Sequence, residues 1–280
     1  MSKDLNESVS MESETVAIIG GGNIGRAITE GLVRCGAIDP TRIVVTRRQV
    51  ELINDLAGMG VSVQNDNLDA LKRSNVIIIA VRPRQLKDLL EGLRPELEPG
   101  RHMIISVVSG IDIREIRGIV GNDIPIIRAM PNLAASICES MTCLAAEKEH
   151  NDALSRAAAL FDNVGHTLVI DEELIVPATA VCACGVAFFF RAIRAASQGG
   201  IEVGFHSEEA LEMAAQTAKG AASLLINGNM HPEAEIDKVT TPRGCTIAGL
   251  NKMEEFGFSS AMIKGMRISA EKAEELVNKD

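Results

Sequence analysis

The chain has 280 residues, of which 46% are hydrophobic and 24% charged, and its formal net charge is -10 at pH 7. This length and hydrophobic content predict a globular protein of about two domains. The negative charge argues against a general nucleic-acid surface, which needs clustered positive charge. The chain also lacks Trp and Tyr, the usual stacking platforms for bases. We therefore expect no nucleic-acid partner.

The opening residues, 1–14, are polar and acidic, unlike the basic, apolar start of a secretory signal or the acid-poor start of a transit peptide. We interpret them as a disordered tail. The six cysteines form no C-x-x-C pair, so neither a zinc site nor a disulfide framework is indicated. Reduced thiols and a cytoplasmic location are the expectation.

A glycine cluster after a short apolar run is the first motif. Residues 16–19 predict a buried strand, and the apolar residues after the cluster recur at helical spacing. In G-x-G-x-x-G spacing, the first glycine permits a tight turn, the second admits a pyrophosphate, and the third lets helix and strand pack closely. We predict a dinucleotide site here; a plain strand-to-helix turn is the alternative. The expected cofactor contacts are Gly20, Gly22, Asn23, Ile24 and Gly25.

The end of the next predicted strand, residues 42–45, indicates which dinucleotide binds. NAD-selective folds place an acid about 20 residues beyond the glycines, whereas NADP enzymes place an arginine there. This chain has no acid at that place but has Thr46, Arg47 and Arg48. Guanidinium groups beside a hydroxyl can hold a 2′-phosphate, so we predict that NADPH is preferred and NADH is possible. The alternative is two solvated arginines at a helix start.

Residues 75–81 form a continuous apolar run, as expected of a strand buried on both faces of a parallel sheet. Ligands of doubly wound sheets lie outside the carboxyl ends of strands, so the loop that follows, with Arg82 and Pro83, should border the cofactor. Strand alternates with helix up to residue 171, which predicts an α/β domain with a Rossmann-type doubly wound sheet over residues 15–171. Other strands are expected at residues 61–63, 103–107, 124–129, 141–145 and 167–170, and helices at 85–93 and 152–161.

The sequence changes character after residue 171. Helical periodicity predominates and no strand of comparable strength follows, so residues 172–280 are predicted to form an all-helical domain. Ser207 and Ser259 suit helix starts. Helices are expected at residues 172–197, 207–227, 246–255 and 259–278.

The longest uncharged stretch, residues 174–190, is marginal in length for a bilayer span. We favour a helix buried on all faces in a protein core or a dimer interface, because nothing else in the sequence resembles a span. No membrane partner is therefore expected.

The loop at residues 239–250, VTTPRGCTIAGL, places hydroxyls, a proline and a glycine immediately before a helical pattern. Several backbone N–H groups can converge on an anion in such a loop. A capped connection between two helices is the alternative.

Taken together and in their order along the chain, these motifs resemble those of pyrroline-5-carboxylate reductase, a family that reduces a cyclic imine with NAD(P)H to make proline. Residues 239–250 resemble the family signature V-T-S-P-G-G-T-T-I-x-G-L. The other matching segments are the glycine turn, AVRP at residues 80–83, SVVSGI at 106–111 and RAMPN at 128–132. The resemblance, which covers nearly everything after the tail, implies no metal and a helical domain that forms a homodimer or higher homo-oligomer.

The resemblance also implies a substrate site for a small cyclic imine. Thr241, Gly244 and Cys245 would frame the substrate carboxylate. Thr246 would hydrogen-bond the ring nitrogen and orient or help to protonate the imine. An ordinary hydroxyl at a helix start is the plainer interpretation of Thr246, and the two roles are compatible.

On the cofactor side, the resemblance places two loops along the dinucleotide. Met130 and Asn132 would border the nicotinamide, although Met130 can equally fill core space. The loop residues expected along the cofactor are Ala80, Val81, Arg82 and Pro83.

Two departures from the family pattern leave the substrate open. Residues 179–188 are TAVCACGVAF where the family usually has T-A-L-S-G-S-G-P-A-Y, and Arg243 stands where the signature has a small residue, commonly glycine. The alternatives are a reductase of another cyclic imino acid and a non-catalytic NADP-binding or scaffolding relative. A β-hydroxyacid dehydrogenase needs a lysine in a G-x-x-x-K helix, and Lys219 precedes its glycine instead.

Overall fold

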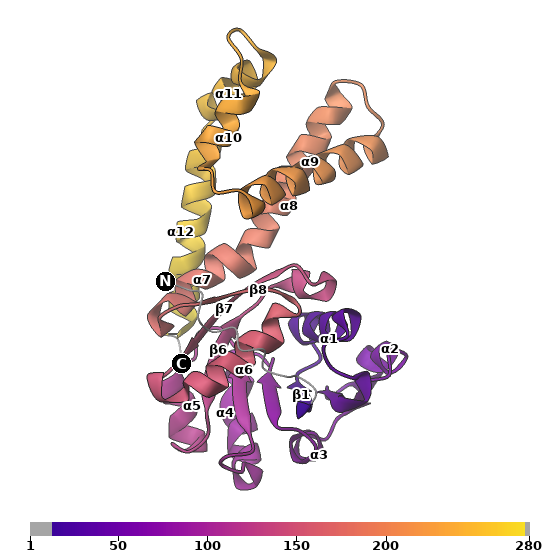
Figure 1. The fold of residues 1–280 in the computed structure, drawn as a ribbon, viewed down its shortest axis with the longest axis vertical. Helices are drawn as coiled ribbons and strands as arrows, with labels where there is room; N and C mark the ends of the chain where they lie inside the picture. Colours follow the sequence, from indigo (N-terminus) through magenta and orange to yellow (C-terminus); the bar gives the residue numbers. More distant parts are fainter. Residues whose placement is uncertain (1–12, 278–280) are drawn as a thin grey trace. The chain divides into compact units, whose positions relative to one another are not determined.

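The structure of the chain is a computed structural model that describes residues 13–277. Residues 1–12, where most of the predicted tail falls, lie outside the described residues. By internal contacts the chain divides into two compact units: one extends to Ala183 and includes the end from Ser269, and the other is Cys184–Ile268. In Figure 1 the first unit carries the sheet and the second consists of helices. The domain boundary after residue 171 stays a prediction.

The first unit, within its described residues, contains one eight-stranded sheet, which confirms the predicted Rossmann-type α/β fold. The strands are β1 (Val16–Ile19), β2 (Ile43–Thr46), β3 (Ser62–Gln64), β4 (Val76–Ile79), β5 (Met103–Ser106), β6 (Ile126–Met130), β7 (Ser140–Ala146) and β8 (Gly165–Val169). Their order is β3-β2-β1-β4-β5-β6-β7-β8. The order reverses between β1 and β4, where open α/β sheets bind their ligands.

One strand pair departs from the parallel arrangement. Strands β1 to β6 are parallel, whereas β7 runs antiparallel to β6, with Met130 opposite Cys143, and β8 is parallel to β7. The connection between β6 and β7 is residues 131–139, which is shorter than the dozen or so residues that a parallel crossover needs. The short connection therefore explains the change of direction.

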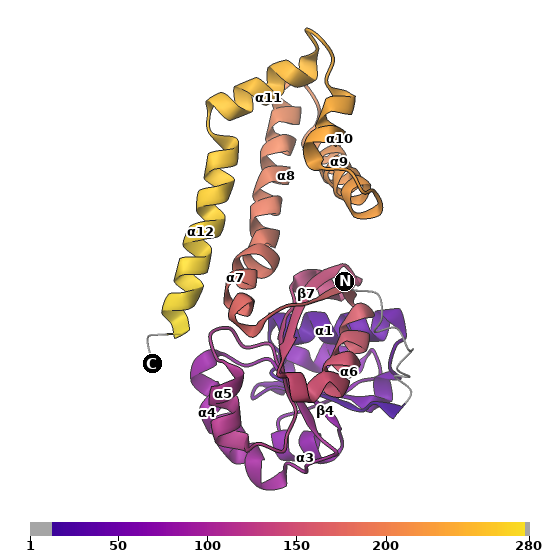
Figure 2. The same cartoon turned by 60° about the vertical axis from the view of Figure 1, so that its left-hand side comes forward.

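Helices cover both faces of the sheet. Figure 2 shows α4 and α5 on one side and α1 and α6 on the other. The α-helices of this part are α1 (Asn23–Cys35), α2 (Asn54–Ala57), α3 (Asn67–Lys72), α4 (Pro83–Leu93), α5 (Ile113–Val120) and α6 (Asn151–Asp162). Short 3-10 helices are η2 (Pro40–Arg42), η3 (Val50–Ile53), η4 (Arg94–Glu96), η5 (Leu133–Ile137), η6 (Lys148–His150) and η7 (Glu172–Leu174).

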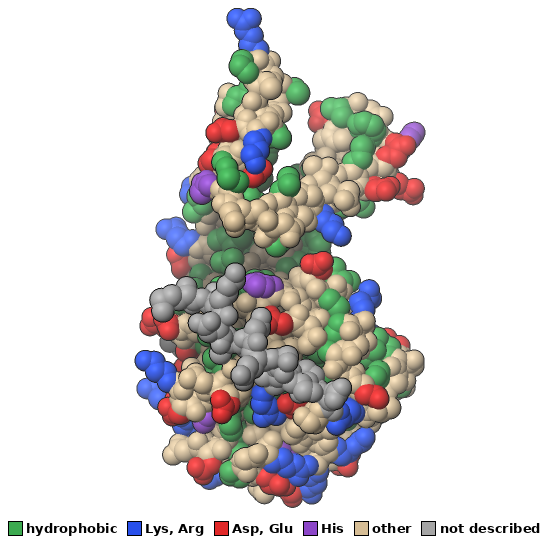
Figure 3. Space-filling view, viewed as in Figure 1, with side chains coloured by type: hydrophobic (Ala, Val, Ile, Leu, Met, Phe, Trp, Pro, Cys, Tyr) green, Lys and Arg blue, Asp and Glu red, His purple; other side chains and the backbone are tan. Residues whose placement is uncertain are grey.

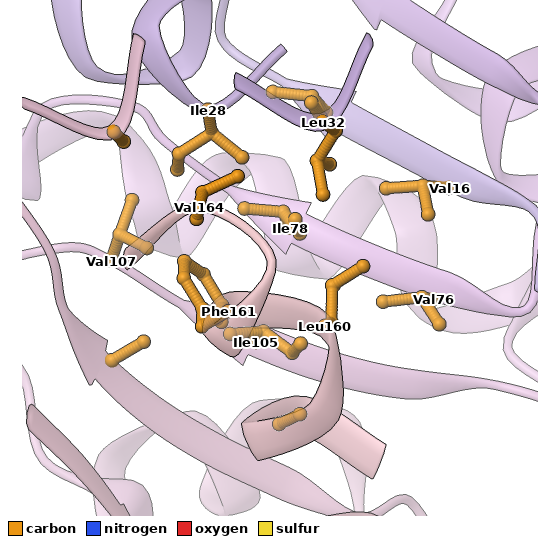
Figure 4. Close-up of a cluster of buried hydrophobic side chains, with 14 of the residues drawn as sticks. Val16, Ile28, Leu32, Val76, Ile78, Ile105, Val107, Leu160, Phe161 and Val164 are labelled. Carbon is orange, nitrogen blue, oxygen red and sulfur yellow. The ribbon is translucent and has the colours of Figure 1, made fainter. Parts of the chain in front are cut away.

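Alternate residues of each central strand enter two separate apolar clusters. Val16 and Ile18 pack with α1 and α6, whereas Ala17 and Ile19 pack with α3, α4 and α5. Figure 4 shows the first cluster, where Phe161 of α6 lies among side chains of the sheet and α1. Burial on both faces explains why these strands are uninterrupted apolar runs.

The chain after residue 171 is helical among its described residues, as predicted. Its elements are α7 (Ile175–Ala178), a π-helical segment (Thr179–Cys184), α8 (Gly185–Glu202), α9 (Ser207–Asn227), α10 (Pro232–Val239), α11 (Cys245–Glu255) and α12 (Phe258–Val277). Helix α9 begins at Ser207, and the N–H of the preceding His206 donates to Glu209 Oε2 over 3.1 Å. Helix α12 begins one residue before Ser259.

The uncharged stretch at residues 174–190 is not buried on all faces within its own chain, so the prediction of a helix in the protein core is wrong. Val181, Phe189 and Phe190 are 61%, 60% and 66% exposed. Figure 3 shows hydrophobic side chains on the surface of the helices. Among the described residues, Glu172–Glu202 is also the one helix long and apolar enough to cross a membrane, a criterion that core helices of soluble proteins meet as well. A role in a subunit interface stays a prediction.

The last residue of the predicted tail is ordered. Glu14 is 4% exposed, and its two carboxylate oxygens accept hydrogen bonds from Nε and Nη2 of Arg156 on α6, both over 2.9 Å. The prediction of disorder is therefore wrong at this residue. A buried carboxylate with a bidentate arginine partner fastens the chain to α6 immediately before β1.

Candidate active site

The glycine turn joins the carboxyl ends of three strands. The N–H groups of Gly20 and Gly21 donate to the carbonyl of Thr46 at the end of β2, over 3.1 and 2.8 Å. Gly20 has φ +115°, and a Cβ there would lie 2.4 Å from the carbonyl oxygen of Ala80, directly after β4. Only glycine fits this backbone conformation and this close approach.

The next two glycines of the motif have different surroundings. A Cβ on Gly25 would lie 2.2 Å from the carbonyl oxygen of Gly20, so this glycine lets α1 pack against the turn. A Cβ on Gly22 would meet none of the described atoms within 4 Å. Gly22 caps α1, and no described side chain hydrogen-bonds this helix start. The N–H groups of its first residues, including Asn23 and Ile24, are therefore available to a phosphate.

The residues proposed to select NADP lie beside this turn. Nη1 of Arg47 donates to the carbonyl of Gly21 over 2.6 Å, and Arg48 is exposed. Thr46 is 1% exposed, and its carbonyl rather than its hydroxyl binds the turn. The structure thus brings Arg47 to the glycine turn, while contact of these residues with a 2′-phosphate stays a prediction.

The loop after β4 lies beside the same turn. The Ala80 N–H donates to the carbonyl of Ile19 over 2.8 Å, and Val81 is half-buried. Arg82 is exposed and precedes α4, which begins at Pro83, where a missing N–H and a fixed φ suit a helix start. The loop is placed at the switch point, as its position after a central strand predicts.

Asn132 is held by hydrogen bonds on all sides. It is 8% exposed; its N–H donates to Ser140 Oγ, its Oδ1 accepts from the N–H of Ala134, and its Nδ2 donates to the carbonyl of Cys182. Met130 is 3% exposed in an apolar cluster, which supports the core-filling interpretation. The predicted nicotinamide contacts at both residues stay predictions.

Arg128 on β6 is a buried charged residue at the same edge of the sheet. Apart from its place in the segment RAMPN, nothing in the sequence singles it out. Arg128 is 2% exposed and lies 3.8 Å from Glu172 Oε1, which also accepts the Ile113 N–H over 2.6 Å. Burial lowers the pKa of Arg128, and the charge of Glu172 opposes that shift. The pair ties β6 to the start of α5 and to the segment that leads into the helices.

The signature loop lies in the second unit, at the start of α11. The Gly244 N–H donates to the carbonyl of Thr241 over 2.9 Å, and a Cβ on Gly244 would lie 2.5 Å from Thr241 Oγ1. Gly244 caps α11, and no described side chain hydrogen-bonds the helix start. The N–H groups of Cys245 and Thr246 are thus at an open helix N-terminus, which suits a carboxylate.

Arg243 has φ +60°, a conformation that costs a non-glycine residue free energy. Its side chain is exposed. The usual glycine of the signature would take this conformation without strain. Whether Thr246 approaches the nicotinamide stays a prediction.

Two family models match this chain, one in the part that forms the sheet and one in the helical part. Residues 15–110 match the family described as NADP oxidoreductase, coenzyme F420-dependent. Residues 172–276 match the family described as pyrroline-5-carboxylate reductase dimerisation. The fold and the glycine turn therefore define an oxidoreductase with a nucleotide cofactor, followed by a helical domain of the dimerisation type.

Similar proteins identify the family. Pyrroline-5-carboxylate reductase 2 of Dictyostelium discoideum is 46% identical over 93% of this chain and 92% of its own length. Pyrroline-5-carboxylate reductase 1 of the same organism is 52% identical over 93% of this chain, which spans 49% of that relative. The structure of a pyrroline-5-carboxylate reductase from Coxiella burnetii is 28% identical and covers 95% of this chain and 99% of its own, with a TM-score of 0.85. This chain belongs to the pyrroline-5-carboxylate reductase family.

Proposed function

We propose that the chain is an NADPH-preferring pyrroline-5-carboxylate reductase, which reduces 1-pyrroline-5-carboxylate to L-proline in the last step of proline biosynthesis. The observation that carries the proposal is the loop at residues 239–250, which matches the family signature and places open backbone N–H groups at the start of α11. Its activity is that of an NAD(P)H-dependent oxidoreductase acting on the CH–NH group of a cyclic imine.

The substrate requires an anion site and a proton. In this proposal, the backbone N–H groups of Cys245 and Thr246 bind the carboxylate, and Thr241 and Gly244 frame it, with the Gly244 N–H bonded to the Thr241 carbonyl to hold the loop. The Thr246 hydroxyl hydrogen-bonds the ring nitrogen and orients the imine for protonation. Reduced nicotinamide, when bound, supplies the hydride. Fixed placement of the ring and its charge supplies much of the acceleration.

The preference for NADPH rests on Arg47 and Arg48. Arg47 is held at the glycine turn by its bond to the Gly21 carbonyl, so its guanidinium lies next to the phosphate-binding helix start. No acid stands at the end of β2, where Thr46, Arg47 and Arg48 lie, to bind the ribose hydroxyls of NADH. Both arginines therefore favour the cofactor with the additional phosphate.

A different cyclic imino acid is the second candidate. Arg243 adds a positive charge and a long side chain to the signature loop, and residues 179–188 replace two serines, a proline and a tyrosine of the usual pattern. An added guanidinium favours a substrate with more negative charge or with its carboxylate placed differently.

We also propose that the chain is cytoplasmic and forms a homodimer or a larger homo-oligomer through its helical domain. The six free cysteines support the location, and the exposed phenylalanines of α8 support the interface. Cell fractionation and sedimentation of the purified chain test the two statements.

The deciding experiment is a spectrophotometric assay of NADPH oxidation with 1-pyrroline-5-carboxylate and with a six-membered cyclic imino acid. The five-membered ring should be reduced faster. A strong preference for the larger ring would favour the second candidate. NADPH binding without oxidation on any imine would indicate a non-catalytic relative.

A further inference from the structure

Two buried cysteines of the first unit face each other. Cys143 lies on β7 and Cys182 in the π-helical segment Thr179–Cys184. They are 39 positions apart in sequence, and their Sγ atoms are 3.7 Å apart. Because a disulfide bond is about 2.05 Å long, a movement of about 1.7 Å would join the two sulfurs.

The surroundings of the two thiols favour a dithiol over a metal centre. They belong to an apolar cluster formed by Met130, Cys143, Ala145, Ile175 and Cys182. A structural zinc ion takes four ligands. Among the described residues, the one group of three or more potential ligands with converging atoms is Glu147, Glu149 and His150, which contains neither cysteine. The two thiols are thus placed to react with each other.

The two thiols are chemically unequal. The hydrogen bond between the two thiols lowers the pKa of Cys182, although burial opposes this shift. The same bond, together with burial, raises the pKa of Cys143. A thiolate is the nucleophilic form of cysteine, so Cys182 is the attacking sulfur and Cys143 the resolving one.

A bond between these residues would act on a segment that contacts the end of β6. Asn132 Nδ2 donates to the carbonyl of Cys182 over 3.1 Å, and the Thr179 hydroxyl donates to Met130 Sδ over 3.6 Å. π-Helical turns are strained and often lie at functional sites. Asn132 and Met130 are also the residues that the family resemblance places beside the nicotinamide, so a covalent tie here would restrict their surroundings.

The geometry points to a reversible disulfide between Cys143 and Cys182 that forms with a hydroperoxide as oxidant and slows turnover by fixing the π-helical segment to β7. The Cys182 thiol loses its proton, and the thiolate attacks the peroxide, forming an S–O bond as the O–O bond breaks; the released hydroxide takes up that proton as water. Cys143 then attacks the sulfenic sulfur, the S–S bond forms, and the hydroxide that leaves takes the Cys143 proton as water. Two thiols thereby lose two hydrogens, and hydrogen peroxide becomes two waters; an external dithiol reverses the change.

The test treats the purified full chain with hydrogen peroxide and maps its cysteines by peptide mass spectrometry. We expect one cross-linked peptide pair joining Cys143 to Cys182, lighter by two hydrogens and restored by dithiothreitol. The melting temperature of the oxidised chain should rise by several degrees, because the bond closes a long loop. The turnover of NADPH with the imine, a readout that rests on the proposed function, should fall severalfold and recover on reduction.

Three variants give the controls. Cys143→Ser and Cys182→Ser should each abolish the cross-link, the rise in melting temperature and the peroxide sensitivity of turnover. Cys184→Ser, two residues further on, should retain all three. Free thiols at both positions after oxidation, or a cross-link between any other pair, would overturn the inference even if the reductase is active. A chain that forms the disulfide but reduces no imine would refute the proposed function instead.

Discussion

The two units of the chain obtain their stability differently. In the first, every residue of β1, β2, β4 and β5 is buried, and apolar clusters lie on both faces of the sheet. In residues 184–268, Ala210 is the one described hydrophobic residue that is buried, while Phe189, Phe190 and Leu224 are more than half exposed. The first unit therefore has its own core, whereas the second leaves much of its apolar surface exposed, which is why we propose an interface there.

The same contrast applies to the two halves of the candidate site. The glycine turn is built by backbone contacts to the ends of β2 and β4 within one unit. The signature loop lies at an exposed helix start, with Thr241, Arg243 and Cys245 all exposed. The proposed cofactor half is therefore built by contacts within one unit, whereas the proposed substrate half is an exposed loop of the other unit.

The largest effect is expected at Gly25. Its substitution by alanine places Cβ 2.2 Å from the Gly20 carbonyl, so the turn must move. Gly25→Ala should lower the free energy of unfolding by about 2–3 kcal/mol and abolish NADPH binding. Urea denaturation and a fluorescence titration with NADPH measure both. Gly22→Ala, where Cβ meets nothing, is the matched control: it should keep its stability and lose only affinity, and equal destabilisation of the two variants would contradict this account.

In the substrate half, Thr246→Ala should slow imine reduction on the order of tenfold to a hundredfold, because a hydrogen bond to the reacting ring is lost. NADPH affinity should be unchanged, since the glycine turn is untouched. Steady-state kinetics with a separate cofactor titration distinguish the two effects. Thr217→Ala, at an exposed position of α9, is the control and should match the unmodified chain. Unchanged turnover in Thr246→Ala would reject the proposed role.

Assembly is tested by placing a charge on the apolar surface of the second unit. Phe190→Asp should weaken self-association by about 20-fold, because a buried aromatic anchor contributes strongly to an interface. Analytical ultracentrifugation over a range of concentrations measures this. Leu52→Asp, at a half-exposed leucine of the first unit, should leave the association constant unchanged. Identical behaviour of the two variants would place the interface elsewhere.

The selection of NADPH is expected to depend on the pair after β2. Arg47→Ala combined with Arg48→Ala should weaken NADPH binding by about tenfold and NADH binding less, since only NADPH carries the 2′-phosphate. Isothermal titration with each cofactor gives the ratio. Arg34→Ala, an exposed arginine in the last turn of α1, is the control. An equal loss for both cofactors would show that neither arginine recognises this phosphate.

The smallest effect is expected at Arg243. Arg243→Gly should raise the free energy of unfolding of the helical unit by about 1 kcal/mol, because glycine adopts φ +60° without strain. Arg243→Ala keeps the Cβ and should show no such gain. Denaturation curves of the two variants give the difference, and the KM for the imine shows whether the guanidinium also contacts substrate. A gain in both variants would indicate a cause other than backbone conformation.

The sequence predicts elements better than it predicts contacts between them. Strand β1 and helix α9 begin and end where the apolar periodicity places them, because that periodicity reflects burial directly. The direction of a strand is harder to predict. The alternation of side chains in β7 would be the same in a parallel and in an antiparallel strand, so only the short connection at residues 131–139 indicates the antiparallel direction. The eight-residue α10 is absent from the predicted helices, since it is short and begins at Pro232 after a turn-forming segment.

Within the candidate site, the glycine spacing predicts the turn, since a Cβ on Gly20 or Gly25 would collide with backbone atoms, while Gly22 leaves the helix start open. The bond from Arg47 to the Gly21 carbonyl and the pairing of Arg128 with Glu172 join residues distant in sequence. They depend on side-chain conformations that no local pattern encodes. The facing of Cys143 and Cys182 is likewise visible only in the fold, because one is on a strand and the other on a π-helical turn.

The bidentate bond between Glu14 and Arg156 has a practical consequence for anyone who shortens or tags this protein. It fixes the point from which the polypeptide enters the first strand, so a shortened or tagged chain should retain Glu14. Removal of Glu14 would leave the guanidinium of Arg156 on α6 without its carboxylate partner. Glu14 is therefore the last residue at which a truncation of this end should stop.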